Sequence, residues 1–457
     1  MLRFVADHLL TPAGWASPGL LEVGAHGRIT RAEAGHDPEA TRLAGFVVPG
    51  VPNLHSHAFQ RALSGRTEHR GATVDSFWTW REAMYDLALR IRPEEARAVA
   101  AQLYVECLEA GMTGVGEFHY LHHAPDGGRY AEPAELSLQL LEAAKDAALP
   151  VTLLPALYLT GGFGRPPTER QRRFICDSGD ELLGIIATAR RAADVVPEAR
   201  VGLAPHSLRA APPDALAATV ASLLADDPEA RIHIHAAEQT DEVEACVAHL
   251  GARPVRWLVD HAGADHRWCL VHATHTEPDE TEALANSGAV AGLCPTTEAN
   301  LGDGVFDGGR FLAAGGAFGV GSDSHVEVSV AAELRLLEYS QRLVHRQRNL
   351  LAGEGPARHV GRRLYEAAAR GGARALGQPA GALQEGLRAD FVVLDPEHPR
   401  MVGHGPDTAL DAFVFGDAGG AVRDVYVAGR HVVAEGRHLH RGEIRARFVE
   451  VMRRLYG

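Results

Sequence analysis

Short apolar segments alternate with amphipathic segments along most of the chain from residue 46 onward. The apolar segments are rich in Val, Ile, Leu and Gly, and most have Gly or Pro nearby. This composition is typical of parallel strands that are buried on both faces. The predicted strands occupy residues 46–54, 114–120, 151–159, 201–206, 231–237, 269–272, 289–294 and 317–322.

The segments between these strands have the spacing of amphipathic helices, as in residues 93–110, 214–225 and 241–250. Pro93 followed by two glutamates, and the proline pair before Asp214, are typical helix starts. Eight strand–helix repeats predict an α/β fold, a (β/α)8 barrel of the TIM type. The alternative is an open doubly wound sheet, but no GxGxxG sequence follows the first predicted strand.

The two ends of the chain have a different pattern. Residues 1–45 consist of short apolar pieces separated by turns, and residues 378–438 return to that style with Gly-containing hairpin signals. Because these segments flank the barrel segment 46–377, we expect them to pack together as one small β-sandwich domain built from both termini. Residues 439–457 are expected to form a C-terminal helix.

The 457-residue chain has 45 basic and 59 acidic side chains, which gives a formal charge of −14. This balance argues against nucleic acid or an anionic membrane as the main partner. The five cysteines are scattered without a CxxC pair, and no apolar run approaches the ~20 residues that span a membrane. The N-terminal residues lack a signal-peptide pattern. We therefore expect a cytoplasmic protein with reduced thiols.

A His-Ser-His sequence, His55 to His57, ends the first predicted strand. Side chains at positions i and i+2 of a strand project to the same face, so both imidazoles point together. In a barrel this is the C-terminal mouth, where active sites lie. On its own, such a pair is a weak signal, because it is more often two hydrogen-bonded histidines of the barrel interior than a metal site.

Three more strands offer an ionisable side chain at the same predicted rim: His235 ends the fifth, His272 the sixth and Asp323 the eighth. Each could be a hydrogen-bonded interior residue, but a whole set of buried ionisable groups is costly unless they are paired or bind a metal. Imidazoles with a carboxylate suit one divalent transition metal, Zn²⁺ first and Fe²⁺ second. The predicted ligands are His55, His57, His235 and Asp323.

Several segments resemble the amidohydrolase superfamily, and the resemblance extends over essentially the whole chain. The matching segments are PGVPNLHSH, HAAE, LVHATH, CPTTEANLGDG and GSDSH. The resemblance implies a barrel hydrolase in which a metal activates water. Members with two metals bridge them with a modified lysine at the fourth strand. This chain has Ala204-Pro205-His206-Ser207 there, and its one lysine, Lys145, lies in a predicted helix, so one metal is expected.

Within the superfamily, Glu238 and His272 match a pair found in the deaminase-type members. The resemblance implies that Glu238 moves a proton from water to the leaving nitrogen and that His272 hydrogen-bonds the attacking group. Asp323, besides ligating, could accept the proton of the water. A positioned carboxyl acid is chemically sensible because ammonia leaves poorly unless it is protonated.

The segment from Phe77 to Tyr85, together with EFHY and PHSLR, is similar to the branch of the superfamily that deiminates N-formimino-L-glutamate in histidine degradation. That substrate is a dianion, and carboxylates suit arginine forks. Arg209, with His206, is assigned to carboxylate binding, and Arg81 to the other end. Gln60 and Tyr120 would add hydrogen bonds. The resemblance also brings the expectation of a homodimer.

Other interpretations stay open at this point. The same metal set would serve a mononuclear deaminase of an aminopurine or its nucleoside, of the guanine or S-adenosylhomocysteine type. Arg81 could be a surface arginine beside two tryptophans, and Tyr120 a packed aromatic. A non-catalytic barrel used as an assembly scaffold is a further class, but such proteins typically lose metal ligands.

Overall fold

The computed structural model describes residues 1–70 and 75–457. Parallel strands at eight positions form its centre, and β9 and β10 share one of these positions because both pair with β8. One sheet has the order β10-β8-β7-β6 with β9 beside β8, and the other has the order β11-β12-β13-β14. Parallel bridges from Leu203 to Ile232 and from Ser56 to Asp323 join the two sheets at both edges, which closes the predicted barrel. The strands are β6 (Val51–Ser56), β7 (Met112–His119), β8 (Val151–Leu157), β9 (Arg200–Val201), β10 (Ala204–Pro205), β11 (Ile232–Ala236), β12 (Trp268–His272), β13 (Val290–Leu293) and β14 (Ala317–Val320).

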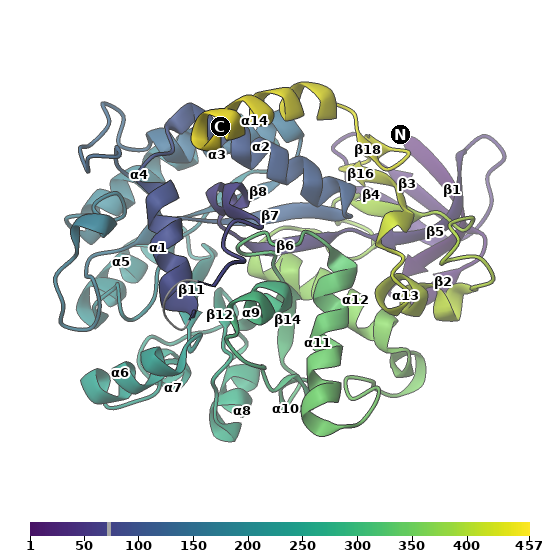
Figure 1. The fold of residues 1–457 in the computed structure, drawn as a ribbon. Helices are drawn as coiled ribbons and strands as arrows, with labels where there is room; N and C mark the ends of the chain where they lie inside the picture. Colours follow the sequence, from purple (N-terminus) through teal and green to yellow (C-terminus); the bar gives the residue numbers. More distant parts are fainter. Residues whose placement is uncertain (71–74) are drawn as a thin grey trace.

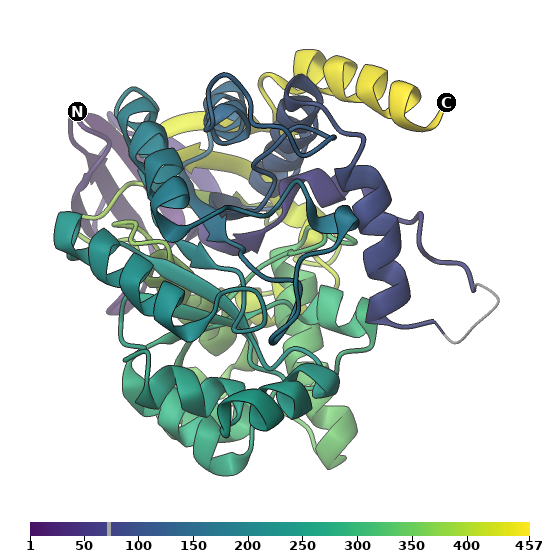
Figure 2. The same cartoon turned by 90° about the vertical axis from the view of Figure 1, so that its left-hand side faces the viewer.

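Helices surround the barrel strands (Figures 1 and 2). Five of them begin with Pro at the first or second position, where the missing N–H costs no hydrogen bond. The helices are α1 (Phe77–Ala88), α2 (Pro93–Glu109), α3 (Glu135–Ala147), α4 (Gly179–Ala193), α5 (Pro213–Asp226), α6 (Thr240–Leu250), α7 (Pro254–Asp260), α8 (Pro278–Ser287), α9 (Pro295–Leu301), α10 (Gly308–Ala313), α11 (Val330–His345) and α12 (Val360–Ala375). Short 3-10 helices are η1 (Ala58–Leu63), η2 (Glu169–Gln171), η3 (Gly355–Arg358) and η4 (Gly419–Ala421).

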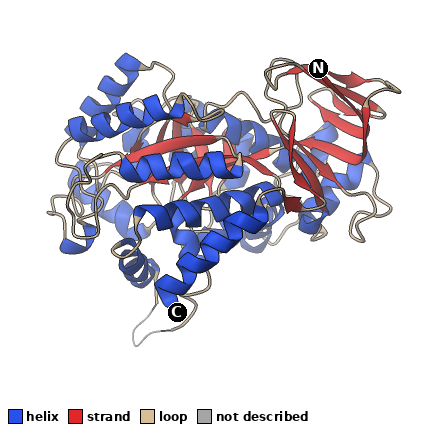
Figure 3. Ribbon diagram, turned by 90° about the horizontal axis from the view of Figure 1, so that it is seen from above, coloured by secondary structure: helices blue, strands red, loops and turns tan. Residues whose placement is uncertain are grey.

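Strands from both termini form a separate sheet beside the barrel (Figure 3). It has nine strands in the order β18-β17-β16-β15-β5-β1-β3-β4, with β2 paired to β1. The strands are β1 (Leu2–Thr11), β2 (Gly14–Ala16), β3 (Gly19–Val23), β4 (Ile29–Ala34), β5 (Thr41–Pro49), β15 (Phe391–Leu394), β16 (Val422–Val427), β17 (Arg430–Ala434) and β18 (Arg437–His438).

The terminal sheet curls over its own apolar core. In β4, at one edge, the Ile29 N–H donates to the Leu387 carbonyl and the Ile29 carbonyl accepts from the Gly386 N–H, in the segment before β15. The ring of Phe4 lies 5.4 Å from the rings of both Phe391 and Tyr426. The expected sandwich is therefore made by one continuous sheet that folds back on itself, not by two separate sheets.

The segment boundaries differ from the sequence-based expectation in two places. Residues 46–49 were expected in the first barrel strand, but β5 continues to Pro49 in the terminal sheet, and the first barrel strand is β6. The stretch 378–438 was expected to be β-structure, yet it contains helix α13 (Pro406–Phe415), which packs on α12. The C-terminal helix α14 (Arg441–Tyr456) lies against α2. In the part of the chain that the structure describes, no helix combines the length and the apolar character that crossing a bilayer requires.

Candidate active site

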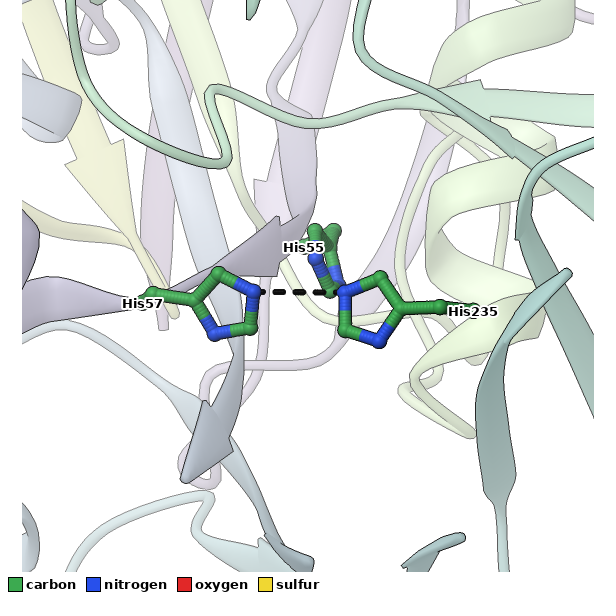
Figure 4. Close-up of side chains that lie close together, drawn as sticks. All are labelled: His55, His57 and His235. Atoms are coloured by element: carbon green, nitrogen blue, oxygen red, sulfur yellow. Dashed lines mark hydrogen bonds between the residues drawn. The ribbon is translucent and has the colours of Figure 1, made fainter. Parts of the chain in front are cut away.

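Four side chains from three separate parts of the barrel converge at the ends of their strands. His55 and His57 come from the end of β6, His235 from β11 and Asp323 from the turn after β14. One ligand nitrogen of each histidine lies within 4.8 Å of the others (Figure 4). Asp323 Oδ1 lies 3.4 Å from the Nε2 atoms of both His55 and His57. The structure thus brings together all four predicted ligands.

Backbone carbonyls fix the direction in which two of these rings point. The carbonyl oxygen of Phe118 accepts a hydrogen bond from His57 Nδ1 at 2.8 Å, and that of His206 accepts one from His235 Nδ1 at 2.9 Å. A carbonyl can only accept, so Nδ1 carries the proton and Nε2 of each neutral ring is a lone-pair acceptor. The two Nε2 atoms face each other at 3.3 Å. Neither can donate to the other, so a cation between them is the arrangement that satisfies both.

The donor set fits a small divalent metal ion. His55 is buried, and both of its ring nitrogens lack a hydrogen-bond partner among the described residues. Two ligands at tetrahedral angles with bonds of about 2.0–2.1 Å are separated by about 3.3–3.4 Å. The separations of His57 Nε2 from His235 Nε2 and from Asp323 Oδ1, 3.3 and 3.4 Å, have this length.

The charge states of these groups also suit metal binding. Burial lowers the pKa of His55 to about 3, so that its ring is neutral near pH 7. Burial would raise the pKa of Asp323, but the close approach of the His55 and His57 rings, at 3.4 Å, outweighs it and lowers the pKa below its usual value. The site therefore combines neutral imidazoles with an anionic carboxylate, the forms in which both ligand types bind metals.

The backbone turns sharply where the strands deliver these side chains. His272 and Asp323 have positive φ angles of 68° and 46°, a conformation that non-glycine residues seldom adopt. Asp323 is held by two backbone bonds, from its own N–H to the His55 carbonyl and from the His57 N–H to its carbonyl. Strained residues of this kind concentrate at functional sites, where the surrounding fold holds them in place.

Glu238 and His272 lie next to the donor set. His272 Nε2 is 3.8 Å from Glu238 Oε1 and 3.8 Å from Asp323 Oδ2. Burial raises the pKa of Glu238 to about 7, and attraction by His272 and Arg209 only partly opposes it. Burial would lower the pKa of His272, but Glu238, Glu298 and Asp323 outweigh it and raise the pKa to about 10. A carboxyl group with a pKa near 7 can both take and give a proton at neutral pH.

One cavity at the mouth of the barrel connects these groups with the predicted substrate-binding residues. Its lining includes every predicted site residue except His55, which lies beneath it: His57, Gln60, Arg81, Tyr120, His206, Arg209, His235, Glu238, His272 and Asp323. The rest of the wall is mostly aromatic or apolar: Phe77, Trp80, Met84, Tyr85, Tyr158, Phe174 and Leu301.

Two guanidinium groups line this cavity. Arg81, on α1, and Arg209, after β10, form no salt bridge within the described residues, and the Nε atom of each is buried without a hydrogen-bond acceptor. Their Cζ atoms lie 4.5 and 5.9 Å from the centre of the Trp78 ring. Trp78 is itself held by a hydrogen bond from its indole N–H to Asp241. The cavity therefore presents two guanidinium groups without a salt-bridge partner among the described residues, although Glu242 and Glu238 attract Arg209 from a distance.

Gln60 and Tyr120 form one polar unit in the wall. Gln60 Nε2 donates to the Tyr120 hydroxyl at 2.7 Å, and the buried Gln60 Oε1 has no partner among the described residues. The His206 ring lies between those of Tyr158 and His235, with centroids 4.6 and 5.0 Å away. Gln60, which lines the cavity, therefore keeps an unused hydrogen-bond acceptor in Oε1.

Sequence reasoning missed two residues that support the site. Glu298, on α9, accepts a hydrogen bond from His272 Nδ1 at 3.2 Å, and only its place in CPTTEANLGDG pointed to it. Arg173 follows Arg172 in a charged stretch of sequence that does not mark it as an interior residue, but its guanidinium is buried. It donates to the carbonyl oxygens of Ala88, Ile91 and His123, which joins the end of α1 to the loop after β7.

Comparisons with known proteins identify the family to which the chain belongs. The model of the amidohydrolase family matches residues 46–432. The chain is 49% identical over 455 residues to formimidoylglutamate deiminase of Pseudomonas aeruginosa, covering 99% of each chain. It is 28% identical over 393 residues to 5-methylthioadenosine/S-adenosylhomocysteine deaminase of Natronomonas pharaonis, covering 85% of this chain and 82% of the relative.

Solved structures have the same fold over nearly the whole chain. An amidohydrolase from Brucella melitensis superposes with a TM-score of 0.94 at 47% identity over 100% of both chains. An adenosine deaminase from Xanthomonas campestris, solved with bound zinc, superposes with a TM-score of 0.79 at 20% identity over 98% of both chains, a likeness of fold alone. Because the family model covers most of the chain and the 49% identity extends over nearly its full length, the chain belongs to the amidohydrolase family.

Proposed function

We propose that the protein is a metal-dependent deiminase that hydrolyses N-formimino-L-glutamate to N-formyl-L-glutamate and ammonia. The observation that carries this proposal is the pair of guanidinium groups, Arg81 and Arg209, that form no salt bridge among the described residues and share a cavity with the metal donor set. A substrate with two carboxylates and a formamidine complements that cavity. The 49% identical relative named formimidoylglutamate deiminase supports the same assignment.

Substrate binding is assigned to the residues of the cavity wall. Arg209, with His206, would hold one carboxylate, and Arg81 would hold the other. Guanidinium groups suit this task because they can donate two parallel hydrogen bonds to a carboxylate. Gln60 Oε1 and the Tyr120 hydroxyl would bond polar groups of the substrate between its two ends.

One divalent metal ion would be held by His55, His57, His235 and Asp323. Zn²⁺ is the first choice for three imidazoles and a carboxylate, and Fe²⁺ is the second. Such an ion, when bound, supplies Lewis-acid activation of water near neutral pH. Substrate binding and proton transfer are assigned to side chains of this chain.

Proton transfer is assigned mainly to Glu238. The oxygen of water bonds to the formimino carbon, and the bond from that carbon to the terminal nitrogen breaks. Glu238 carries both protons of the water, one after the other, to that nitrogen, which leaves as ammonia while the oxygen stays on the carbon as the formyl carbonyl. Its pKa of about 7 suits this shuttle. Asp323 is the second carboxylate within reach as a proton acceptor. His272, 3.8 Å from both carboxylates, would donate a hydrogen bond to the developing tetrahedral centre.

The cellular setting is also a proposal. We infer a cytoplasmic homodimer with a small-molecule substrate, without nucleic acid or membrane as a partner. The acidic balance of −14 supports the last point. The homodimer follows from family resemblance, and sedimentation of the purified protein would test it.

The function is tested by comparing substrates with the zinc-loaded protein. Release of ammonia is measured from N-formimino-L-glutamate, guanine and S-adenosylhomocysteine at equal concentrations. We expect turnover of N-formimino-L-glutamate alone, because guanine offers no carboxylate to the two arginines and S-adenosylhomocysteine offers only one. Preferential turnover of a purine would overturn the assignment in favour of an aminopurine or nucleoside deaminase.

A further inference from the structure

The carboxylate of Glu298 lies behind His272, on the side away from the reacting groups. Glu298 Oε1 is 3.2 Å from His272 Nδ1, while His272 Nε2 lies 3.8 Å from both Glu238 and Asp323. Both Glu298 and His272 are buried. The two ring nitrogens therefore have separate partners, a carboxylate behind and the cavity in front.

The backbone on both sides of the contact between His272 and Glu298 is constrained. His272 and the next residue, Ala273, both have positive φ angles, 68° and 51°, and the Ala273 N–H donates back to the Val271 carbonyl, which makes a tight turn at the ring. Glu298 is also fixed, because its Oε1 accepts a second hydrogen bond, 2.9 Å long, from the Cys294 N–H at the start of α9. A carboxylate anchored to a helix start thus meets an imidazole on a tight turn.

From this geometry we propose that Glu298 is a positioning residue for the deimination. It keeps a proton on His272 Nδ1 and holds the ring so that Nε2 is the nitrogen presented to the cavity. A carboxylate that orients a histidine in this way is the general arrangement of a catalytic dyad, in which the carboxylate does not touch the substrate. The inference rests on the proposed function for its reaction, but not for the contact itself.

A purely structural role is the competing explanation. In that case Glu298 would serve only as an acceptor for the Cys294 N–H at the start of α9. Two substitutions separate the roles. Glu298→Gln keeps an acceptor oxygen but removes the charge, and Glu298→Met removes both while keeping the volume. Glu333→Gln is the matched control, because Glu333 is a buried carboxylate that also bonds α9, through the Thr296 N–H and hydroxyl, and it does not line the cavity.

Kinetics in two backgrounds test the coupling to His272. We expect Glu298→Met to lower kcat for N-formimino-L-glutamate by roughly 10- to 100-fold, with KM changed by less than about 2-fold and one metal per chain retained. Glu298→Gln should recover part of that loss, and Glu333→Gln should keep the wild-type kcat. In a His272→Asn background, Glu298→Met should not lower kcat further, because the effects of substitutions at two interacting residues do not add. Equal losses in both backgrounds, or an unchanged kcat, would overturn the proposal.

A spectroscopic readout keeps the contact testable without the substrate. A ring N–H bonded to a carboxylate gives a downfield proton resonance, and we expect one that is lost in both Glu298→Met and His272→Asn but kept in Glu333→Gln. If the wild type fails to deiminate N-formimino-L-glutamate while this resonance behaves as stated, the proposed function fails and the dyad stands. If the resonance is absent from the wild type, or survives Glu298→Met, the dyad is wrong whatever the substrate.

Discussion

His57 Nε2 and His235 Nε2 lie 3.3 Å apart, although the Nδ1 atom of each ring already donates to a backbone carbonyl. Two lone pairs at this distance repel unless a cation lies between them. The fold therefore builds an electrostatic requirement for a metal into the end of the barrel, and several measurable consequences follow from it and from the cavity above it.

Metal removal should lower stability as well as abolish activity. A ligand that binds only the folded state stabilises it by about 4 kcal/mol at 1,000 times its Kd. We therefore expect one divalent ion per chain by elemental analysis, a lower Tm after chelation, and recovery of both Tm and activity on adding Zn²⁺. His57→Ala should have a Tm that a chelator does not change. An identical Tm for the wild type with and without chelator would contradict a metal site.

Arg209 and Arg81 should act on substrate binding. Losing a hydrogen-bonded charge costs about 1.5–3 kcal/mol, so Arg209→Met and Arg81→Met should each lower kcat/KM by roughly 10- to 150-fold, mostly through KM. Arg165→Met is the matched control, since Arg165 is exposed and lines the adjoining cavity with both arginines but not the one beside the metal donors.

Substrate analogues identify which carboxylate each arginine binds. Each arginine variant is assayed with N-formimino compounds that lack one carboxylate. If an arginine binds the missing carboxylate, replacing that arginine should lower the activity toward this compound little more than the missing carboxylate already does. Wild-type kinetics for Arg209→Met with the full substrate would refute the dianion argument.

Glu238 should set the pH dependence of the reaction. Its pKa is raised to about 7, because burial outweighs the attraction of His272 and Arg209, and the group must be ionised to accept a proton. As pH rises through about 7, the ionised fraction increases, so kcat/KM should increase and then level off. Glu238→Gln should retain its metal but lose about 10²- to 10⁴-fold in kcat. A profile that is flat between about pH 5.5 and 8.5 would speak against this assignment.

Arg173 should be a main contributor to the stability of the cavity wall. Arg173→Met leaves the carbonyl oxygens of Ala88, Ile91 and His123 without this donor, which we expect to cost about 3 kcal/mol of unfolding free energy. Arg172→Met is the control, because Arg172 is half-buried and bonds loop carbonyls of Pro125 and Glu169. Denaturant unfolding measures both, and equal small losses would show that burial of Arg173 matters little.

The barrel and the metal donors could be predicted because their signals are local. A buried parallel strand is a short apolar run, and His55 with His57 shows directly that two side chains share a face. The ends of parallel strands meet at one rim, so His235 and Asp323 follow from topology alone. The same reasoning gave the terminal β-segments but placed residues 46–49 in the barrel, since an apolar run does not say which of two sheets it joins.

The supporting residues could not be predicted because their partners are distant in sequence. Arg173 is buried only because three carbonyls from two other segments reach it, and beside Arg172 it looks like part of a charged surface. Glu298 contacts a histidine 26 positions away, and nothing in the local pattern marks that pair. Contacts of this kind are set by tertiary packing, which a single sequence does not show.

The most direct test follows the formimino carbon, because that carbon carries two C–N bonds and only one choice is a deimination. N-formimino-L-glutamate labelled with ¹³C at this carbon is incubated with the zinc-loaded protein and followed by NMR, with ammonia measured in parallel. We expect labelled N-formyl-L-glutamate and ammonia in equal amounts, at a rate that Glu238→Gln greatly reduces. Labelled formamide with free L-glutamate, or no conversion by fully metal-loaded protein, would contradict this expectation.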